Sequence, residues 1–501
     1  MSVRSVNQRS DEPAAAPTKK LFFSVFPSIA LPMFLAVLDQ TIVATALPAI
    51  AASLGDVTHI SWVVTSYLIA ATVAAPVYGR LGDAFGRRRL MFAGLAILIV
   101  GSALCAVAPN LLFLSLARVL QGLGGGGLMT SSQALIGQMI PPRERGRYQG
   151  YLAAVVVSSS AFGPVVGGYL TQHLGWPAIF LINLPIGFVA ALLLMRLPRQ
   201  SSFDDTVHLD LRGLALFITF AGATLLAIDL TQHFDSERSL AILVVAMSAV
   251  VALIVFVRHE WRNPAPLLPI ALMRMPAIWR CDALAACHGA ALVSLITFLP
   301  LYLRVVPGAS ASESGLLLLP LTASVGLGAV ITGRLVSKTG RTFVFPSCGL
   351  VVSVIAVVCL ALLAPQLSRV QMSCFLAVYG AFMGTAMGVV NVTVQSMAGP
   401  TMLGAAAGAV QFSRLVGAGI GTAIVGSVLF LSLSAVDSEA AGLFKRVVEL
   451  GPDVLAGLGQ ARRAAVQTEI ADAFRAAFLV VGVFTAGALV LSWLNPIRRV
   501  V

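Results

Sequence analysis

The chain has 501 residues, of which 58% are hydrophobic and only 11% are charged, whereas soluble domains carry about 25% charged residues. This composition excludes an ordinary soluble enzyme and indicates a membrane protein with many apolar segments, which are long and continuous and therefore predict helices and not a barrel. The formal net charge is +12, but the basic residues gather on alternate loops between apolar runs, so we expect no nucleic-acid partner.

The lengths of the apolar runs predict about fourteen membrane-spanning helices. In chain order the expected spans are 27–51, 60–79, 89–108, 111–133, 148–170, 176–197, 212–230, 240–258, 281–303, 314–336, 342–364, 371–394, 404–434 and 473–495. The fold class is therefore an all-α polytopic membrane protein. Because the loops on the side of both termini hold most of the lysines and arginines, we expect both termini in the cytoplasm and the bilayer to be the cell inner membrane.

A weak internal repeat divides the chain into two halves. The stretch from Gly79 to Arg87 is echoed by the stretch from Gly333 to Arg341, with Ser337 in place of Asp83. Repeated halves of this kind are typical of secondary transporters. We expect a cytoplasmic tail at 1–26, an N-terminal six-helix half at 27–197, a linker with an inserted helix pair at 198–258, and a C-terminal six-helix half at 259–501. The last contains an amphipathic external loop at about 435–472.

The first span carries an acid in its interior. Asp39 lies in the sequence from Leu38 to Pro48, and a carboxylate at that depth costs about 2.5–3.5 kcal/mol on insertion scales. It must therefore face the protein interior or a water-filled cavity. We interpret it as a site for a proton or for a cationic substrate; the alternative is a structural carboxylate that is hydrogen-bonded to its neighbours.

The loop after the second span, residues 79–89, is dense in charge and glycine. It holds Gly79, Asp83, Gly86, Arg87 and Arg88. Asp83 can accept hydrogen bonds from arginines and from a nearby helix N-terminus, which would form a conformational latch. The alternative is that the arginines only set the topology of the chain.

The fourth span contains Arg118 followed by Gln121. A buried arginine needs a counter-ion. We weigh equally a role in proton coupling and a structural pair with Asp83 or a polar neighbour.

The fifth span is rich in glycine around a proline. It contains Gly150, Gly163, Pro164, Gly167 and Gly168. Proline bends a helix and glycine lets a neighbouring helix approach closely. We interpret the segment as a tight, bent seal between the two halves.

These segments together resemble the fourteen-helix drug:proton antiporter family of the major facilitator superfamily, over almost the whole chain. In that family's motifs Ala44 and Thr45 replace an Asn-Val pair, Ala84 replaces a basic residue and Ser159 replaces a glycine, while the run from Trp176 to Gly187 follows the sixth-helix motif. The resemblance implies a major facilitator fold, proton coupling through Asp39 and Arg118, a latch in the 79–89 loop, and an antiporter motif at 150–168 that is typical of exporters.

Other polar and aromatic residues in the spans are candidates to line a substrate cavity. These are Trp62, Tyr67, Gln121, Phe180, Asn183, Phe298, Asn391 and Gln395. The roles of Asp229, Asp282, His288 and Arg414 stay open. We expect no catalytic residues, no metal site and no cofactor.

The leading functional hypothesis is a proton-driven exporter of small amphiphilic, drug-like compounds, with a periplasmic adaptor as a candidate partner. The first alternative is a dedicated exporter of one metabolite or natural product on the same fold. A membrane-embedded enzyme is a weaker alternative, because the sequence has no clustered histidines, Cys-His pair, paired catalytic carboxylates or nucleotide-binding loop.

Overall fold

The computed structural model describes residues 18–55, 60–198, 210–232, 239–263, 266–268, 270–309, 311–450 and 459–499. The first bundle and the helices that follow it are α1 (Thr18–Ile42), η1 (Val43–Thr45), α2 (Leu47–Leu54), α3 (Trp62–Phe85), α4 (Arg87–Ala106), α5 (Leu111–Met139), α6 (Pro142–Leu174), α7 (Ala178–Leu181), α8 (Asn183–Met195), α9 (Leu211–Gln232) and α10 (Ser239–Glu260). The remainder are α11 (Ile270–Met273), α12 (Pro276–Val305), α13 (Ala311–Thr339), α14 (Val344–Leu363), η3 (Ala364–Gln366), α15 (Arg369–Ala398), α16 (Leu403–Val436), α17 (Ser438–Leu450) and α18 (Gln460–Leu494).

The all-α fold class is confirmed. Among the described residues, 13 helices are long and apolar enough to cross a membrane, and Leu211–Thr224 in α9 is a shorter apolar stretch. Most helices extend a few residues beyond the apolar runs that predict them, because a helix continues into the headgroup region after its apolar stretch ends. Several ends carry helix-start signals: Asn110 caps α5 by accepting from the N–H of Phe113 (2.8 Å), and Ser368 and Gln371 form a capping box at α15.

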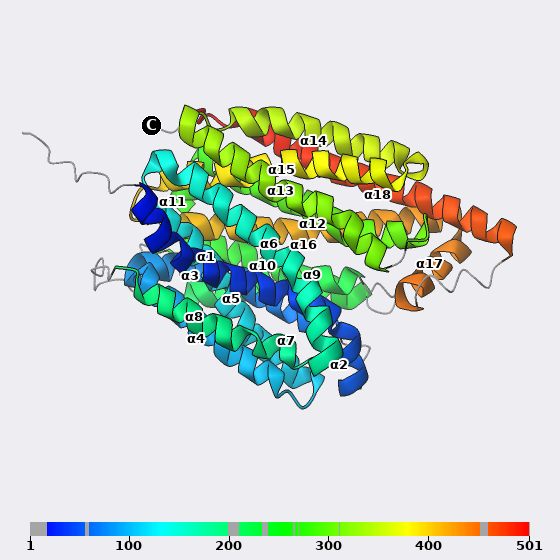
Figure 1. The fold of residues 1–501 in the computed structure, drawn as a ribbon, viewed down its shortest axis with the longest axis horizontal. Coiled ribbons are helices and arrows are strands. Elements are labelled where there is room, and N and C mark those ends of the chain that lie inside the picture. The colour runs from blue at the N-terminus through cyan, green and yellow to red at the C-terminus, as the bar shows by residue number, and fades with distance from the viewer. Residues whose placement is uncertain are drawn as a thin grey trace, which may run out of the picture.

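Two helical bundles, each with its own core, make up most of the molecule (Figure 1). Helices α1 to α8 surround apolar residues that include Leu35, Leu98 and Leu128. Helices α12 to α18 surround a larger cluster that includes Leu299 and Phe474. The amphipathic helix α17 belongs to the second core, which contains its Phe444.

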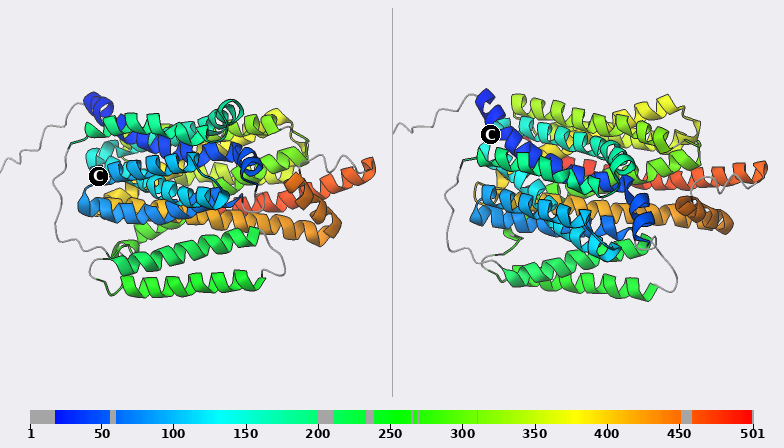
Figure 2. Two further views of the ribbon diagram at one scale, coloured as in Figure 1. Left: turned by 90° about the horizontal axis from the view of Figure 1, so that it is seen from below. Right: turned by 60° about the horizontal axis from the view of Figure 1, so that its bottom comes forward.

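Helices α9 and α10 lie beside the two bundles as a separate pair (Figure 2). Phe217 of α9 is fully buried, and its ring centroid lies 5.4 Å from Phe256 of α10 and 5.1 Å from Phe412 of α16. The same apolar cluster includes Val73 of α3. The pair therefore packs on one helix from each bundle.

Two of the expected spans are broken in the structure. The first was expected to run to residue 51, but α1 ends at Ile42 and a turn of 3₁₀ helix precedes the short helix α2, which has Pro48 near its start. The sixth divides at Ile182 into α7 and α8. Proline disfavours a continuous helix just before it, and Pro48 and Pro185 follow the two breaks. Apolar run length alone misses such breaks.

Asp210 anchors the start of the inserted pair. Its Oδ1 accepts from the N–H of Gly213 (2.8 Å), which is N-capping, and its carboxylate also contacts His259 Nε2 and Asn263 Nδ2. Burial alone would raise the pKa of Asp210, but the bonds from Gly213, His259 and Asn263 outweigh burial, so the pKa lies below its ordinary value. The stabilisation is therefore complete at neutral pH and is lost as the pH falls below the ordinary aspartate value of about 3.9 and through the lower pKa of the folded state.

Replacing Asp210 with alanine should loosen the first turn of α9 by about 0.5–2 kcal/mol, the usual cost of losing an N-cap. Hydrogen–deuterium exchange at pH 7 measures this in the amides of residues 211–214. The control is Asp210→Asn, because asparagine keeps the capping acceptor. Equal exchange in Asp210→Ala and the original protein would contradict the prediction.

Candidate functional site

A buried polar network surrounds Asp39 inside the first bundle. Asp39 Oδ2 accepts from Arg118 Nη1 (2.9 Å), and Oδ1 accepts from Gln121 Nε2 (3.0 Å) and Asn183 Nδ2 (2.6 Å). Ser102 Oγ accepts from both amides, at 2.7 Å and 3.0 Å. We call Asp39, Ser102, Arg118, Gln121 and Asn183 the Asp39 network. Four helices, α1, α4, α5 and α8, supply it.

Arg118 makes hydrogen bonds and a cation–π contact in addition to its ion pair with Asp39. Its Nε donates to the carbonyl of Val63 (3.1 Å), Nη1 also donates to Gln121 Oε1 (2.8 Å), and its guanidinium lies 4.3 Å from the ring centroid of Tyr67. The Tyr67 hydroxyl in turn donates to the carbonyl of Ala36 (3.0 Å). A buried ion pair is tolerated when further hydrogen bonds and π contacts satisfy both partners, as they do here.

Glycines let the helices of this site approach closely. A Cβ on Gly122 would overlap the backbone of Tyr67, and one on Gly101 would lie 2.7 Å from the Gln121 side chain. Small residues at such crossings are typical of membrane helix packing. The glycine-rich run in α5 thus brings the arginine on α5 against α3 and the acid on α1.

The Asp39 network has no net charge, and both oxygens of the Asp39 carboxylate already accept hydrogen bonds. Both carboxylate oxygens of Asp39 already accept from three side chains, and Asp39 is fully buried. A cationic substrate would have to displace Arg118 to bind the acid.

A second polar cluster joins the two bundles at the end near the 79–89 loop. Asp83 accepts from Arg87 and from the backbone N–H groups of Gly404 and Ala405, both at 2.9 Å, at the N-terminus of α16. A helix N-terminus favours a negative charge. We call Asp83, Arg87, Gly404 and Ala405 the Asp83 latch. A Cβ on Gly79 would overlap the carbonyl of Gly404, so the two helices touch backbone to backbone.

Residues 79–89, expected as a loop, are helical except at Gly86, because α3 continues to Phe85 and α4 begins at Arg87. Gly86 has φ of 91°, a left-handed conformation that permits the sharp turn between α3 and α4. Arg87 also donates to Gln138 of α5. Arg88 donates to the carbonyls of Leu194 (3.2 Å) and Met195 (3.1 Å) at the end of α8. These arginines thus make specific contacts beyond setting topology.

The glycine-rich segment of α6 packs in two directions. Gly163 and Gly167 lie against the end of α1 and η1, where a Cβ on Gly163 would overlap Thr41. Gly150 instead faces the carbonyl of Ala329 in α13 (2.7 Å from an added Cβ). A Cβ on Gly168 would meet nothing within 4 Å, and Pro164 is exposed within a helix that continues past it. The expected seal between the halves is therefore made at Gly150, while Gly163 and Gly167 pack within one half.

The expected cavity residues fall into three groups. Gln121 and Asn183 are fully buried and donate to Asp39, and Tyr67 and Phe180 pack against Arg118. Trp62 and Phe298 are half-buried, the latter 3.1 Å from a Cβ added to Gly426. Asn391 is buried, and Gln395 Nε2 donates to the carbonyl of Gln133 in the other bundle (3.0 Å).

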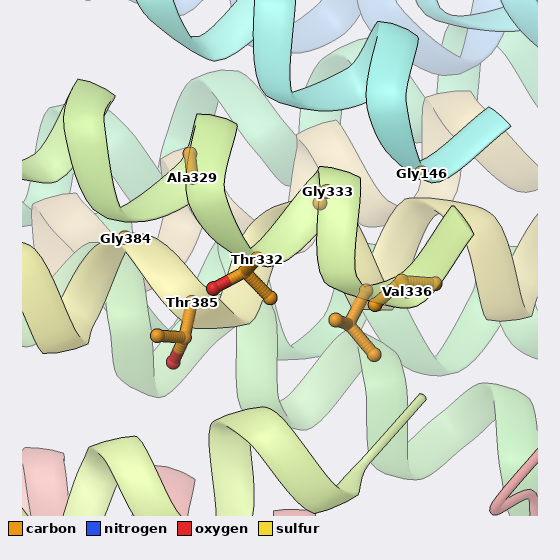
Figure 3. A pocket seen from close by; sticks show the side chains of 9 residues that line it. Gly146, Ala329, Thr332, Gly333, Val336, Gly384 and Thr385 are labelled. Carbon is orange, nitrogen blue, oxygen red and sulfur yellow. The ribbon is translucent and has the colours of Figure 1, made fainter. Parts of the chain in front are cut away.

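A shallow hollow, too narrow to hold a water molecule, lies between α6, α13 and α15 (Figure 3). Its lining is small and almost uncharged, with Thr332, Gly333 and Thr385 among its residues. This hollow marks the glycine-mediated crossing of the two bundles and offers no group that would orient a polar ligand.

Three of the residues whose roles the sequence leaves open are described. Asp282 is buried and neither carboxyl oxygen has a hydrogen-bond partner among them. His288 Nε2 donates to the carbonyl of Met383 (3.2 Å), and Arg414 Nε donates to Gln411 (3.2 Å). The side chain of Asp229 lies outside the described residues. Within the described part of the chain no three potential metal ligands cluster.

The fold and these two clusters define a multi-pass membrane transporter with two bundles that meet at a polar latch. The sequence model of the Major Facilitator Superfamily matches residues 29–422. The chain is 33% identical over 488 residues to an MFS-type transporter of Mycobacterium tuberculosis, covering 97% of this chain and 71% of the relative. It is 30% identical to Multidrug transporter protein MdtP of Bacillus subtilis, covering 79% and 73% of the two chains.

Solved structures agree on the fold. The human organic anion transporter MFSD10 superposes with a TM-score of 0.66 at 14% identity, covering 96% of this chain and 100% of that one. The proton:xylose symporter XylE superposes with a TM-score of 0.61 at 13% identity, covering 95% and 96%. The chain belongs to the major facilitator superfamily. It is accordingly a transporter and not an enzyme.

Proposed function

We propose that this protein is a proton-coupled antiporter that exports small amphiphilic compounds, with Asp39 as the proton site. The observation that carries the proposal is the fully buried pair of Asp39 and Arg118. Intramembrane acids of this kind typically serve proton relays. Protonation of Asp39 would remove the charge that holds Arg118, so proton binding would change the packing of α1 against α5.

The coupling would act through the contact between the bundles. Hydrogen bonds between the bundles include those of the Asp83 latch and that from Gln395 to the carbonyl of Gln133. Gly150 and Ala329 add a close backbone crossing. In our proposal these contacts close one side of the transporter, and the latch opens when the bundles rock around the central substrate. We further propose the inner membrane as the location, cytoplasmic termini, and no cofactor beyond the proton gradient.

The test uses inverted membrane vesicles with an acid interior and a fluorescent pH reporter. Addition of several unrelated amphiphiles should collapse the gradient with the original protein. Vesicles with Asp39→Asn should show at least a tenfold lower rate, because asparagine keeps the size of the side chain and carries no exchangeable acid proton. Collapse at the same rate in both would remove Asp39 as the proton site.

A dedicated exporter of one natural product is the second candidate. It is favoured by a relative in Aspergillus aculeatus, 33% identical over 353 residues, whose name places it in the acurin A biosynthesis cluster. The chain covers 63% of that relative. In the vesicle assay this candidate predicts a response to one compound class only, and a panel of unrelated amphiphiles separates the two candidates.

We also propose a periplasmic adaptor as a partner. Co-purification in a mild detergent tests for it.

A further inference from the structure

Arg414 is a half-buried residue of α16 whose backbone packs against Gly289 of α12 in the same bundle. Its Nε donates to Oε1 of Gln411, one turn earlier (3.2 Å). The amide of Gln411 reaches Met129 Sδ of α5 across the boundary between the bundles (3.8 Å). The Arg414 side chain therefore points back along α16 toward the meeting surface, as long helical side chains do.

No acid balances this arginine in the described part of the chain. The ion pairs there involve other residues, and Arg414 has only the bond to neutral Gln411. Arg118, the other intramembrane arginine, has Asp39. A guanidinium without a counter-ion inside a membrane protein is costly, and such groups typically mark a substrate or ion path.

The surroundings of Arg414 are polar and incompletely hydrogen-bonded. The backbone of α12 at Gly289 touches that of α16 at Arg414, which brings the preceding residue, His288, close. His288 is buried, and its Nδ1 has no hydrogen-bond partner. Arg414 itself is half-buried, and its Nη atoms are not among the buried polar atoms that lack a partner. Because no hydrogen bond of these Nη atoms is found among the described residues either, the donor edge of Arg414 keeps accessible surface.

The intramembrane charged groups of the two bundles differ in net charge. The Asp39 network is neutral, whereas the Arg414 region carries an uncompensated positive charge. Asp282, on the same helix as His288, forms no ion pair among the described residues. An ionised carboxylate without any donor would be strongly disfavoured at that buried position. The central region therefore favours a negatively charged ligand.

We propose that Arg414 and Gln411 bind the anionic headgroup of an amphiphilic organic acid, so that carboxylate-bearing compounds are the preferred substrates. The planar guanidinium can donate in parallel to both oxygens of a carboxylate. The apolar part of the acid would contact apolar side chains at the same boundary, such as Met129 of α5, and its charge would balance that of Arg414. As a statement about exported substrates this rests on the proposed function, but the binding site itself can be tested without transport.

The test compares three ligands of matched shape on the purified protein in detergent. These are naphthalene-2-carboxylate, the neutral 2-naphthamide and the cationic 2-naphthylmethylamine. Isothermal titration calorimetry at pH 7.5 should rank the carboxylate first with the original protein. Arg414→Gln should weaken carboxylate binding at least tenfold and change binding of the amide and the amine less than twofold. Arg414→Lys should give an intermediate loss, because it keeps the charge without the parallel donors.

The matched control is Arg369→Gln, which removes an exposed arginine that is paired with Glu313 at a helix end. It should leave all three affinities unchanged. Equal affinities of the original protein for the three ligands would overturn the anion site, and this comparison needs no variant to fold. An equal loss for all three ligands in Arg414→Gln would also overturn it, since that result indicates a structural role.

The same ligands, added to the acid-interior vesicles, separate this inference from the proposed function. Carboxylate-selective, Arg414-dependent binding without proton movement would sustain the anion site and contradict proton coupling. Gradient collapse by all three ligands alike, with equal binding, would sustain proton-coupled export and overturn the anion site.

Discussion

Replacing Arg118 with methionine should lower the free energy of unfolding by about 3–5 kcal/mol, the usual cost of removing one partner of a buried ion pair. The change leaves Asp39 fully buried with two amide donors and no positive charge. It also removes the guanidinium that lies over Tyr67 and bonds the carbonyl of Val63. Equilibrium unfolding by SDS titration in mixed micelles measures the loss.

A double variant tests the cause. Asp39→Asn combined with Arg118→Met removes the uncompensated charge and should be more stable than Arg118→Met alone. Arg369→Met is the surface control and should cost less than about 1 kcal/mol, because its pair with Glu313 is exposed. Additive losses in the double variant would show that the pair is not the source of the stability.

Gly404→Val should nearly eliminate the conformation in which α3 and α16 touch. A Cβ at Gly404 would overlap the carbonyl of Gly79 and lie 2.8 Å from Asp83 Oδ1, so the Asp83 latch has no room to close. In the proposed alternating-access cycle the two helices would be apart in the opposite conformation, which the variant would still reach. We therefore expect a folded protein whose transport rate falls at least a hundredfold.

Spin-label distances across the latch measure this shift. Labels at Arg80 and Thr401, on a background without the six native cysteines, should give a short distance in the original protein and only a long one in Gly404→Val. The matched control is Gly222→Val in α9, where an added Cβ meets nothing within 4 Å. A short distance retained in Gly404→Val would contradict the closed geometry of the latch.

The sequence predicts much of the local structure and part of the site. The carboxylate in the 79–89 loop was expected to accept from an arginine and from a helix N-terminus, and Asp83 does both. Which helix supplies that N-terminus was out of reach, because α16 begins more than three hundred positions later in the chain. Periodicity and run length describe contacts along one helix and carry no information on which helices meet.

The partner of Arg118 could likewise not be predicted from the sequence, because it lies on another helix. The sequence indicates that Asp39 and Arg118 are both buried charges, but the structural partner considered for Arg118 was Asp83 or a polar neighbour, and the structure pairs it with Asp39. Asn183 and Gln121 were expected to line a cavity, since polar residues inside spans commonly face substrate or water. Instead they complete the hydrogen bonds of Asp39, an arrangement that depends on the crossing of four helices.

The position of α9 and α10 has a consequence for how lipophilic compounds reach the protein. Their aromatic residues Phe217 and Phe256 cover the contact between α3 and α16. A compound dissolved in the bilayer would meet α9 and α10 on this flank, and not the contact between α3 and α16. On the opposite flank, α6 crosses α13 through Gly146, Gly150 and Gly333, with no such cover among the described helices. A compound dissolved in the bilayer would therefore reach a contact between the two bundles directly only on the α6–α13 flank, where the backbones are closely packed.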